Sequence, residues 1–250
     1  MMQKLILGDC LEKMAEIPSG SVNMVLCDLP FEMISCEWDK QIPLEKLWIQ
    51  YDRICKENSA IVLFAAQPFT TDLINSNRKN FRYDLVWNKN VPTGMSQAKY
   101  RPMRYHETVL LFYKSQPTYN PVPKPRIGEK KECYNYDHYC GESNHVKLAK
   151  VKKRYDPNFV QPSSVLDFKV VPNRNGKLHP TQKPIDLCEW LIKTYSNEGD
   201  LILDNCMGSG TTLLAAKNLG RQFIGIEKEE KYYNIAHKRI FGESAPQIVI

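Results

Sequence analysis

The 250-residue sequence lacks any long hydrophobic run. At the N-terminus, in MMQKLILGDC, the apolar stretch stops at Asp9 after only a few residues. A helix that spans a bilayer needs about 20 predominantly apolar residues, and a secretory signal needs an apolar segment behind a basic start. Neither pattern is present, so we expect a soluble intracellular protein. The length suits one domain with a sizeable core, or one domain that carries a long insertion.

Paired cysteine spacing is also missing. The eight cysteines are scattered, and several stand in strand-like or helix-like runs where a thiol packs as a small hydrophobic group. We therefore expect reduced thiols in a reducing compartment. Cys133, His138, Cys140 and His145 bring metal-ligating residue types together, but their spacing does not follow the short cysteine pairs of zinc sites. We predict no metal there.

The net charge of +6 is confined to one segment. Residues 116–178 hold 12 of the 34 Lys and Arg but 6 of the 28 Asp and Glu, which leaves the rest of the chain neutral. The same segment holds seven of the 16 prolines and five of the 13 tyrosines. Cations interleaved with aromatic residues suit combined contact with phosphates and bases. We interpret residues 116–178 as a basic insertion that binds nucleic acid; a solvated, partly disordered insertion is the alternative.

On either side of the insertion, residues 1–115 and 179–250 alternate strand and helix patterns. This alternation predicts an α/β sheet with helices on both faces. The strand patterns lie near Lys4–Leu7, Val22–Asp28, Ala60–Ala65, Tyr83–Asn88, Thr108–Tyr113, Leu201–Leu203 and Phe223–Ile226. The helical patterns lie near Leu44–Lys56, Phe69–Asn77, Ile185–Tyr195, Thr211–Leu219 and Lys231–Ile240.

A glycine loop near the C-terminus, in LILDNCMGSGTTLLAAKNLGRQFIGIE, predicts a nucleotide site. A buried strand ends in Asp204, Gly208 and Gly210 permit a tight turn, and a helix follows. Glu227 ends the next strand, roughly twenty residues further on, where nucleotide-binding folds place a carboxylate on the ribose hydroxyls. The third glycine of the dinucleotide motif is missing, which favours an adenosine-bearing cofactor with few or no phosphates. A crossover with two incidental glycines is the alternative.

Asp28-Leu29-Pro30-Phe31 is an unusual end for a buried strand, because a carboxylate, a proline and an aromatic ring follow an apolar run. By itself this tetrapeptide is also compatible with an ordinary strand-ending turn. Together with HPTQKP from His179 to Pro184 and DNCMGSGTT from Asp204 to Thr212, it resembles the amino-directed DNA methyltransferases that use S-adenosylmethionine. The order of the motifs resembles the permuted (beta) group, in which the catalytic motif precedes the cofactor motif.

The resemblance covers Lys4 to about Ile240, except for the basic insertion, which falls where the family keeps its target-recognition region. It implies a Rossmann-like methyltransferase sheet with circularly permuted motif order. It also implies S-adenosylmethionine as cofactor, double-stranded DNA as substrate, and the cytoplasm of a prokaryotic or phage-infected cell. Family members often form homodimers. No particular restriction endonuclease partner is implied.

The resemblance implies catalytic roles for Asp28, Leu29, Pro30 and Phe31. A carboxylate oxygen of Asp28 and the carbonyl of Leu29 would each accept one N–H of an exocyclic amine. Its nitrogen then becomes pyramidal, with its lone pair aimed at the methyl group. Pro30 would present that carbonyl, and Phe31 would stack on a base flipped out of the duplex. Leu29 and Phe31 replace the family's proline and tyrosine, and neither change removes an acceptor.

Two further sets of residues follow from the resemblance. Those implied to bind the cofactor are Asp9, Cys10, Asp28, His179, Thr181, Lys183, Asp204, Cys206, Gly208, Ser209, Gly210, Thr211, Thr212 and Glu227. Those expected to contact DNA, from the insertion and from a mobile loop at residues 87–107, are Lys89, Lys99, Arg101, Arg104, Lys124, Arg126, Lys130, Lys131, Lys152, Lys153 and Arg154. Plainer interpretations remain open: Asp9 as a turn residue, HPTQKP as a helix entry, and each cation of residues 87–107 as ordinary surface.

The residue type at position 28 distinguishes between two possible acceptor amines. In the family, aspartate with an aromatic residue goes mostly with adenine N6, whereas serine goes with cytosine N4. Asp28 therefore favours adenine, with cytosine N4 as the alternative. A domain that binds DNA or a partner subunit without catalysis is an alternative of a different class, and RNA is a less favoured substrate.

Overall fold

We describe the protein from a computed structural model, which places residues 2–30, 41–126, 158–172 and 178–242. The chain divides into two compact units, one formed by Met1–Asn120 with Ser164–Ile250 and the other by Pro121–Ser163. The second unit is therefore shorter than the predicted insertion at 116–178. The difference arises because residues 164–178 include a strand of the main sheet. No helix among the described residues has the length and apolarity needed to cross a membrane.

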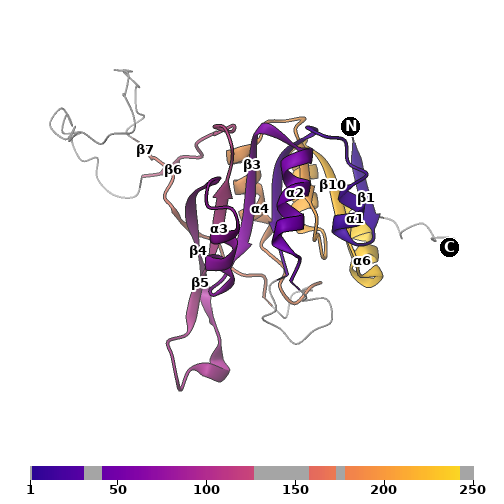
Figure 1. The fold of residues 1–250 in the computed structure, drawn as a ribbon. Coiled ribbons are helices and arrows are strands. Elements are labelled where there is room, and N and C mark those ends of the chain that lie inside the picture. The colour runs from indigo at the N-terminus through magenta and orange to yellow at the C-terminus, as the bar shows by residue number, and fades with distance from the viewer. Residues whose placement is uncertain (1, 31–40, 127–157, 173–177, 243–250) are drawn as a thin grey trace. The chain divides into compact units, whose positions relative to one another are not determined.

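The first unit is built on an eight-stranded mixed sheet (Figure 1), whose strand order is β1-β10-β9-β2-β3-β5-β4-β8. The five neighbouring strands β1, β10, β9, β2 and β3 run parallel to one another. Strand β5 is antiparallel to both of its neighbours, and β8 is parallel to β4. The strands are β1 Gln3–Leu7, β2 Val22–Asp28, β3 Cys55–Ala65, β4 Phe81–Thr93, β5 Arg104–Phe112, β8 Val165–Asp167, β9 Leu201–Asp204 and β10 Gln222–Glu227.

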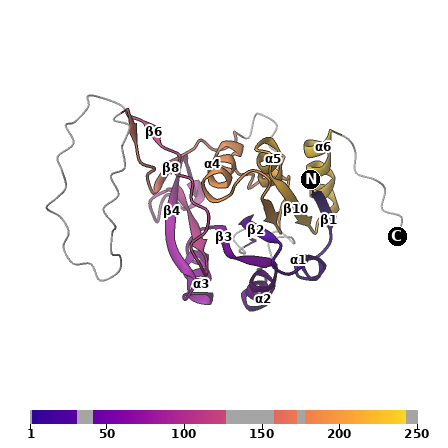
Figure 2. The same cartoon turned by 90° about the horizontal axis from the view of Figure 1, so that it is seen from above.

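Helices cover both faces of this sheet, as predicted. Figure 2 shows α1, α2 and α3 on one side and α4, α5 and α6 on the other. The helices of the described residues are α1 Cys10–Met14, α2 Leu44–Ile54, α3 Phe69–Ser76, α4 Ile185–Tyr195, α5 Thr211–Asn218 and α6 Glu230–Phe241, and a 3₁₀ turn, η1, lies at Met95–Gln97.

The predicted elements are all present, and the differences are local. The short α1 had no helical pattern long enough to detect, and the Asp9 side chain caps it by accepting the Leu11 N–H at 2.9 Å. The structure corrects the expected loop at residues 87–107. Most of it is strand, because β4 continues to Thr93 and β5 begins at Arg104, so that the two form a long hairpin.

The second unit is described only at its base. Strands β6, Lys124–Pro125, and β7, Phe159–Val160, pair antiparallel, and the Arg126 N–H donates to the Asn158 carbonyl at 2.7 Å. The two ends of the described part of this unit, Arg126 and Asn158, therefore lie side by side.

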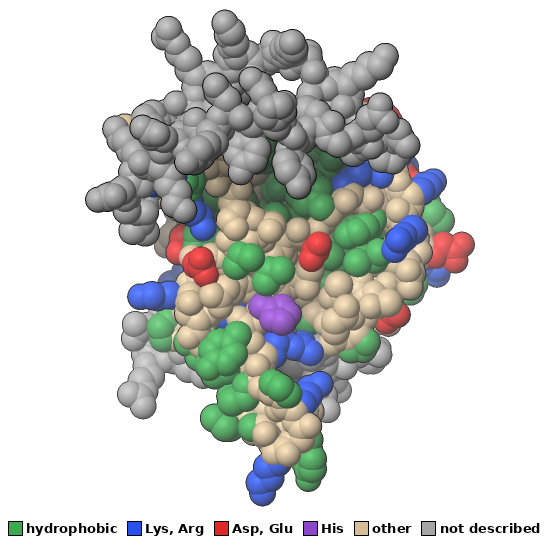
Figure 3. Space-filling view, turned by 90° about the vertical axis from the view of Figure 1, so that its left-hand side faces the viewer, with side chains coloured by type: hydrophobic (Ala, Val, Ile, Leu, Met, Phe, Trp, Pro, Cys, Tyr) green, Lys and Arg blue, Asp and Glu red, His purple; other side chains and the backbone are tan. Residues whose placement is uncertain are grey.

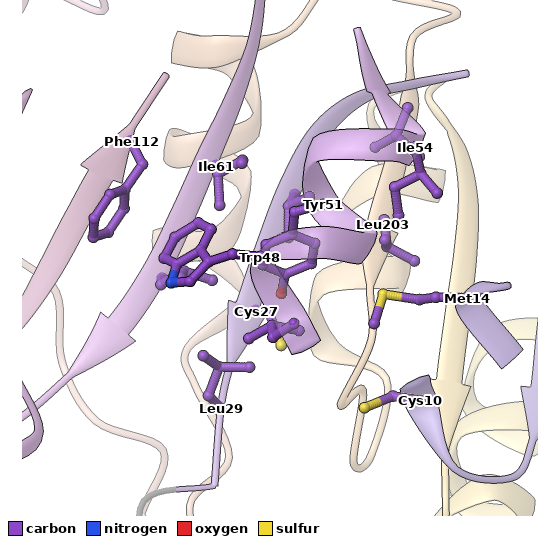
Figure 4. Close-up of a cluster of buried hydrophobic side chains, with 14 of the residues drawn as sticks. Cys10, Met14, Cys27, Leu29, Trp48, Tyr51, Ile54, Ile61, Phe112 and Leu203 are labelled. Atoms are coloured by element: carbon purple, nitrogen blue, oxygen red, sulfur yellow. The ribbon is translucent and has the colours of Figure 1, made fainter. Parts of the chain in front are cut away.

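The side-chain alternation of β2 decides which way its terminal acid points. Val25 and Cys27 belong to the apolar cluster that α2 contributes to through Trp48 and Tyr51 (Figure 4). Successive side chains of a strand point to opposite faces, so Asp28 points to the other face, which α4 covers. A residue just before α4 is thus well placed to meet it.

The parallel strands also bring the predicted motifs to one edge. The chain leaves β9 toward β10 on one side and leaves β2 toward β3 on the other, so β9 and β2 meet at a topological switch point. Ligands of open α/β sheets bind at such a point, beyond the carboxyl ends of the strands. The register pairs Gly225 with Asp204, Leu7 with Glu227 and Asp28 with Phe64, so these acids all stand at that edge.

Candidate active site

A cavity of about 590 Å³ opens at this edge of the sheet. Its lining joins segments that the sequence separates widely: the turn after β1, the end of β2, the β4–β5 hairpin, the HPTQKP segment and the glycine loop. The predicted site residues that line it are Asp9, Cys10, Asp28, Leu29, Pro30, Lys89, Arg104, His179, Thr181, Lys183, Asp204, Cys206, Gly208, Ser209, Thr211, Thr212 and Glu227. The predicted catalytic and cofactor motifs therefore share one space.

The Glu227 carboxylate organises the glycine loop. One of its oxygens accepts the Gly208 N–H at 2.8 Å, and the other accepts the Glu229 N–H at 2.8 Å. Burial raises the pKa of Glu227, although these backbone donors oppose the shift. Gly210 has a φ of 75°, and a Cβ there would come within 3.0 Å of Ala236 and Ile240. Glycine at this position therefore lets the loop approach α6.

Asp204 lies behind the loop and supports it. Its carboxylate accepts the Cys206 N–H at 3.2 Å, and burial raises the pKa of Asp204 to about 7. Arg239, from α6, donates to the Thr211 hydroxyl at 2.8 Å and to the Ser209 carbonyl at 3.1 Å. These contacts hold the start of α5 in place beside the cavity.

The turn after β1 supplies Asp9 and the buried Cys10. The carboxylate of Asp9 caps α1 and lines the cavity at the same time. The Cys10 thiol meets that of Cys206, whose hydrogen bond lowers the pKa of Cys10 against the effect of burial. The cysteine of the glycine loop thus contacts the first residue of α1.

The HPTQKP segment contributes two kinds of contact. His179 lies against the glycine loop, since a Cβ on Gly208 would be 3.5 Å from its ring, and its ring centroid is 4.2 Å from that of Tyr232. The Thr181 hydroxyl lies 3.1 Å from Nδ1 of His179. Both residues therefore stand beside the loop that the resemblance assigns to the cofactor.

Lys183, from the same segment, reaches the predicted catalytic motif. Its ammonium lies 2.5 Å from Oδ2 of Asp28, and the residue is 8% exposed. Burial alone would lower the pKa of Lys183, but the carboxylates of Asp28 and Glu107 outweigh it and raise that pKa. The resemblance assigned Lys183 to cofactor binding, and the structure brings it to the Asp28 carboxylate.

Glu107 is a site residue that the sequence analysis did not single out. Its carboxylate lies 3.4 Å from the Lys183 ammonium and accepts a hydrogen bond from Lys89 at 3.1 Å. Burial raises the pKa of Glu107, but the two lysines more than compensate and lower it. The available signal was an acid directly before the apolar run TVLLF, in the first half of a strand that antiparallel pairing turns toward the site.

The cations of the β4–β5 hairpin fall into two groups. Lys89 is only 3% exposed and is paired with Glu107, so the structure places it inside the cavity wall rather than on a DNA-facing loop. Lys99 and Arg101 are exposed near the tip, and Arg104 lies at the cavity. Figure 3 shows basic and hydrophobic side chains together on this projecting hairpin, where Tyr100 is 88% exposed.

Several predicted residues lie outside the described part of the chain. They are Phe31, Lys130, Lys131, Lys152, Lys153 and Arg154, as well as the Cys133–His145 segment. Lys124 and Arg126 are described and belong to the second compact unit.

Comparisons with known proteins all point to the same protein family. The family model described as DNA methylase matches residues 22–238. The type II methyltransferase M1.MboII of Moraxella bovis is 29% identical, over 92% of this chain and 93% of its own. M.BglII of Bacillus subtilis is also 29% identical, over 97% of this chain and 70% of its own.

Solved structures share the fold. The crystal structure of an M1.HpyAVI–SAM complex has a TM-score of 0.64 and 25% identity, and the match covers 96% of this chain and 100% of that one. The PvuII DNA methyltransferase, described as cytosine-N4-specific, has a TM-score of 0.66 at 17% identity, covering 97% of this chain and 87% of its own.

Proposed function

Because the chain belongs to the DNA methylase family and is an S-adenosylmethionine-dependent DNA methyltransferase, we propose that its acceptor is the N6 amine of an adenine flipped out of duplex DNA. The shared cavity, in which the acid of Asp28-Leu29-Pro30 and the glycine loop line the same space, supports methyl transfer at this site, and the aspartate at position 28 supports adenine as the base. Base flipping supplies the substrate to that space, since the amine is not accessible inside a duplex.

The cavity fits the cofactor's parts. Glu227 accepts backbone N–H groups with both oxygens and keeps further lone pairs for ribose hydroxyls, while Asp9 offers a carboxylate to an adenine amine. The turn at Gly208, with a φ of 49°, keeps side-chain bulk out of the loop beside them. The resemblance assigns His179 and Thr181 to the cofactor as well, and both line this cavity. The bound cofactor supplies an electrophilic methyl group on a sulfonium sulfur.

Asp28 and Leu29 then prepare the nucleophile. The amine lone pair is delocalised into the base, and two acceptors, one on each N–H, localise it on nitrogen. Lys183 favours the ionised carboxylate of Asp28, so that this group acts only as an acceptor. Leu29 is buried and Pro30 fixes the next φ, which holds the carbonyl of Leu29 in place. Positioning of the amine supplies much of the acceleration.

Aspartate at position 28 supports adenine rather than cytosine, since the resembling family uses serine mostly for cytosine N4. The test is to digest methylated product DNA to nucleosides and identify the modified one by mass spectrometry. We expect N6-methyldeoxyadenosine. Recovery of N4-methyldeoxycytidine instead would overturn the choice of base while leaving the enzyme class intact.

We also propose that DNA is held by the hairpin cations Lys99, Arg101 and Arg104 and by the second compact unit. The hairpin projects from the edge that holds the cavity, and residues 90–105 include no acid. Phosphate contacts by such cations give affinity without sequence preference. Recognition of the target sequence is assigned to residues 121–163. A homodimer stays a proposal from the resemblance alone.

Replacement of residues 127–157 by a short Gly/Ser linker tests this division of labour. Arg126 and Asn158 are hydrogen-bonded at 2.7 Å, so a short linker can join them and leave the β6–β7 pairing intact. We expect weaker DNA binding with a shallower dependence on salt, because seven cations are removed. Cofactor affinity, measured by calorimetry, stays within about twofold. Equal loss of both affinities would contradict the assignment.

A further inference from the structure

The buried ion pairs at the cavity form one continuous chain across the sheet. Asp28 on β2 contacts Lys183 at 2.5 Å, and Lys183 contacts Glu107 on β5 at 3.4 Å. Glu107 contacts Lys89 on β4 at 3.1 Å, and Lys89 donates to the Thr93 hydroxyl at 3.1 Å. The chain therefore links the catalytic motif to the β4–β5 hairpin.

Lys183 spans the strand that separates the two acids. β3 lies between β2 and β5, and Phe64 of β3 is paired in register with Asp28. The Lys183 ammonium stands 5.1 Å from the centroid of the Phe64 ring. The phenyl ring has no acceptor atom for the ammonium. The hydrogen-bonding partners that set the position of the ammonium across β3 are therefore the carboxylates on either side.

We propose that Glu107 is a positioning residue for methyl transfer: it draws the Lys183 ammonium away from exclusive contact with Asp28 and so fixes the orientation of the Asp28 carboxylate toward the amine. The inference rests on the proposed role of Asp28. A lysine shared between two carboxylates leaves more of the acceptor capacity of Asp28 to the substrate than a lysine paired with Asp28 alone. Glu107 itself does not contact the reacting atoms.

The arrangement also gives Glu107 a role in the pH range of the enzyme. The charged groups that face Lys183 are Asp28 from β2 and Glu107 from β5, while the nearby thiol of Cys188 in α4 is neutral because burial raises its pKa to about 12. Burial disfavours the charged form of Lys183, and the two carboxylates favour it. With only one carboxylate left, Lys183 loses its proton at lower pH.

Glu107→Gln tests the proposal, because the amide keeps the shape but removes the charge, and its single oxygen replaces only one of the two carboxylate oxygens that face Lys89 and Lys183. We expect kcat to fall about tenfold, the loss of activity at alkaline pH to begin at lower pH, and KM for the cofactor to stay within about twofold. Asp84→Asn, which removes the same charge from an exposed position of the neighbouring strand β4, is the matched control and leaves all three unchanged.

A double-mutant cycle decides whether Glu107 acts through Lys183. We expect Glu107→Gln to cost less than about twofold in kcat in a Lys183→Met background, since the residue to be positioned is gone. Glu107→Asp, which restores the charge, recovers part of the alkaline range and also serves if the glutamine variant does not fold. Full tenfold effects in both backgrounds, or an unchanged pH profile, would overturn the inference.

The same assays separate this inference from the proposed function. If Asp28→Ala retains wild-type kcat, the role of Asp28 fails and the inference fails with it. If Asp28→Ala abolishes transfer while Glu107→Gln leaves kcat and the pH profile unchanged, only the inference is lost.

Discussion

Asp28→Ala lowers kcat for methyl transfer to DNA by about 10²–10³-fold, which is the usual cost of removing one group that stabilises charge in a transition state. The amine loses its anionic acceptor, and the carbonyl of Leu29 alone does not localise the lone pair. The measurement is incorporation of labelled methyl groups into mixed-sequence DNA at saturating cofactor. Cofactor affinity changes far less, since the glycine loop and Glu227 are left intact.

Asp28→Asn is the isosteric companion. It keeps the volume and one acceptor oxygen but loses the charge that faces Lys183 at 2.5 Å, so we expect a similar loss of kcat. A domain that binds DNA without catalysis predicts a different result: the wild-type protein would bind the cofactor and transfer nothing. Retention of kcat within tenfold in Asp28→Ala would contradict the proposed mechanism.

Glu227→Ala weakens cofactor binding on the order of 100-fold. The substitution removes the acceptor of the Gly208 and Glu229 N–H groups and the proposed acceptor of the ribose hydroxyls. Hydrogen bonds to a charged group contribute about 1.5–3 kcal/mol each, and one or two of them account for the loss. The dissociation constant of S-adenosylmethionine, measured by calorimetry, gives the result directly.

Glu230→Ala is the matched control for this prediction. Glu230 begins α6, three residues further on, and its side chain is exposed. It carries the same charge change without touching the glycine loop, so the dissociation constant is expected to stay within about twofold. An effect of Glu227→Ala no larger than that of Glu230→Ala would show that the loop does not depend on Glu227.

Much of the fold could be predicted because its signals are local. β2 and α4 begin and end where the sequence places them, since a run of buried apolar residues and a proline-led helix start each determine their own limits. Helices on both faces of the sheet follow from the alternation of such segments. The circular permutation inferred from motif order stays a prediction.

The close packing around Gly225 illustrates what a local pattern does not contain. A Cβ there would lie 2.1 Å from Leu213 and 2.5 Å from the Met207 sulfur, so β10 accepts only glycine beneath α5. Nothing in FIGIE distinguishes this glycine from one in a flexible strand. The requirement appears only when the helix is packed on the sheet.

The sequence by itself determined the acids that end buried strands, the glycine loop and the family, because strand, turn and helix signals act over a few residues. Only the tertiary structure decided which charges meet. Lys183 and Asp28 are 155 residues apart, and Glu107 joins them because β5 pairs antiparallel with β3 and turns its first half toward the site. Such contacts depend on strand order and register, which are set by packing between distant segments and not by the residues beside each charge.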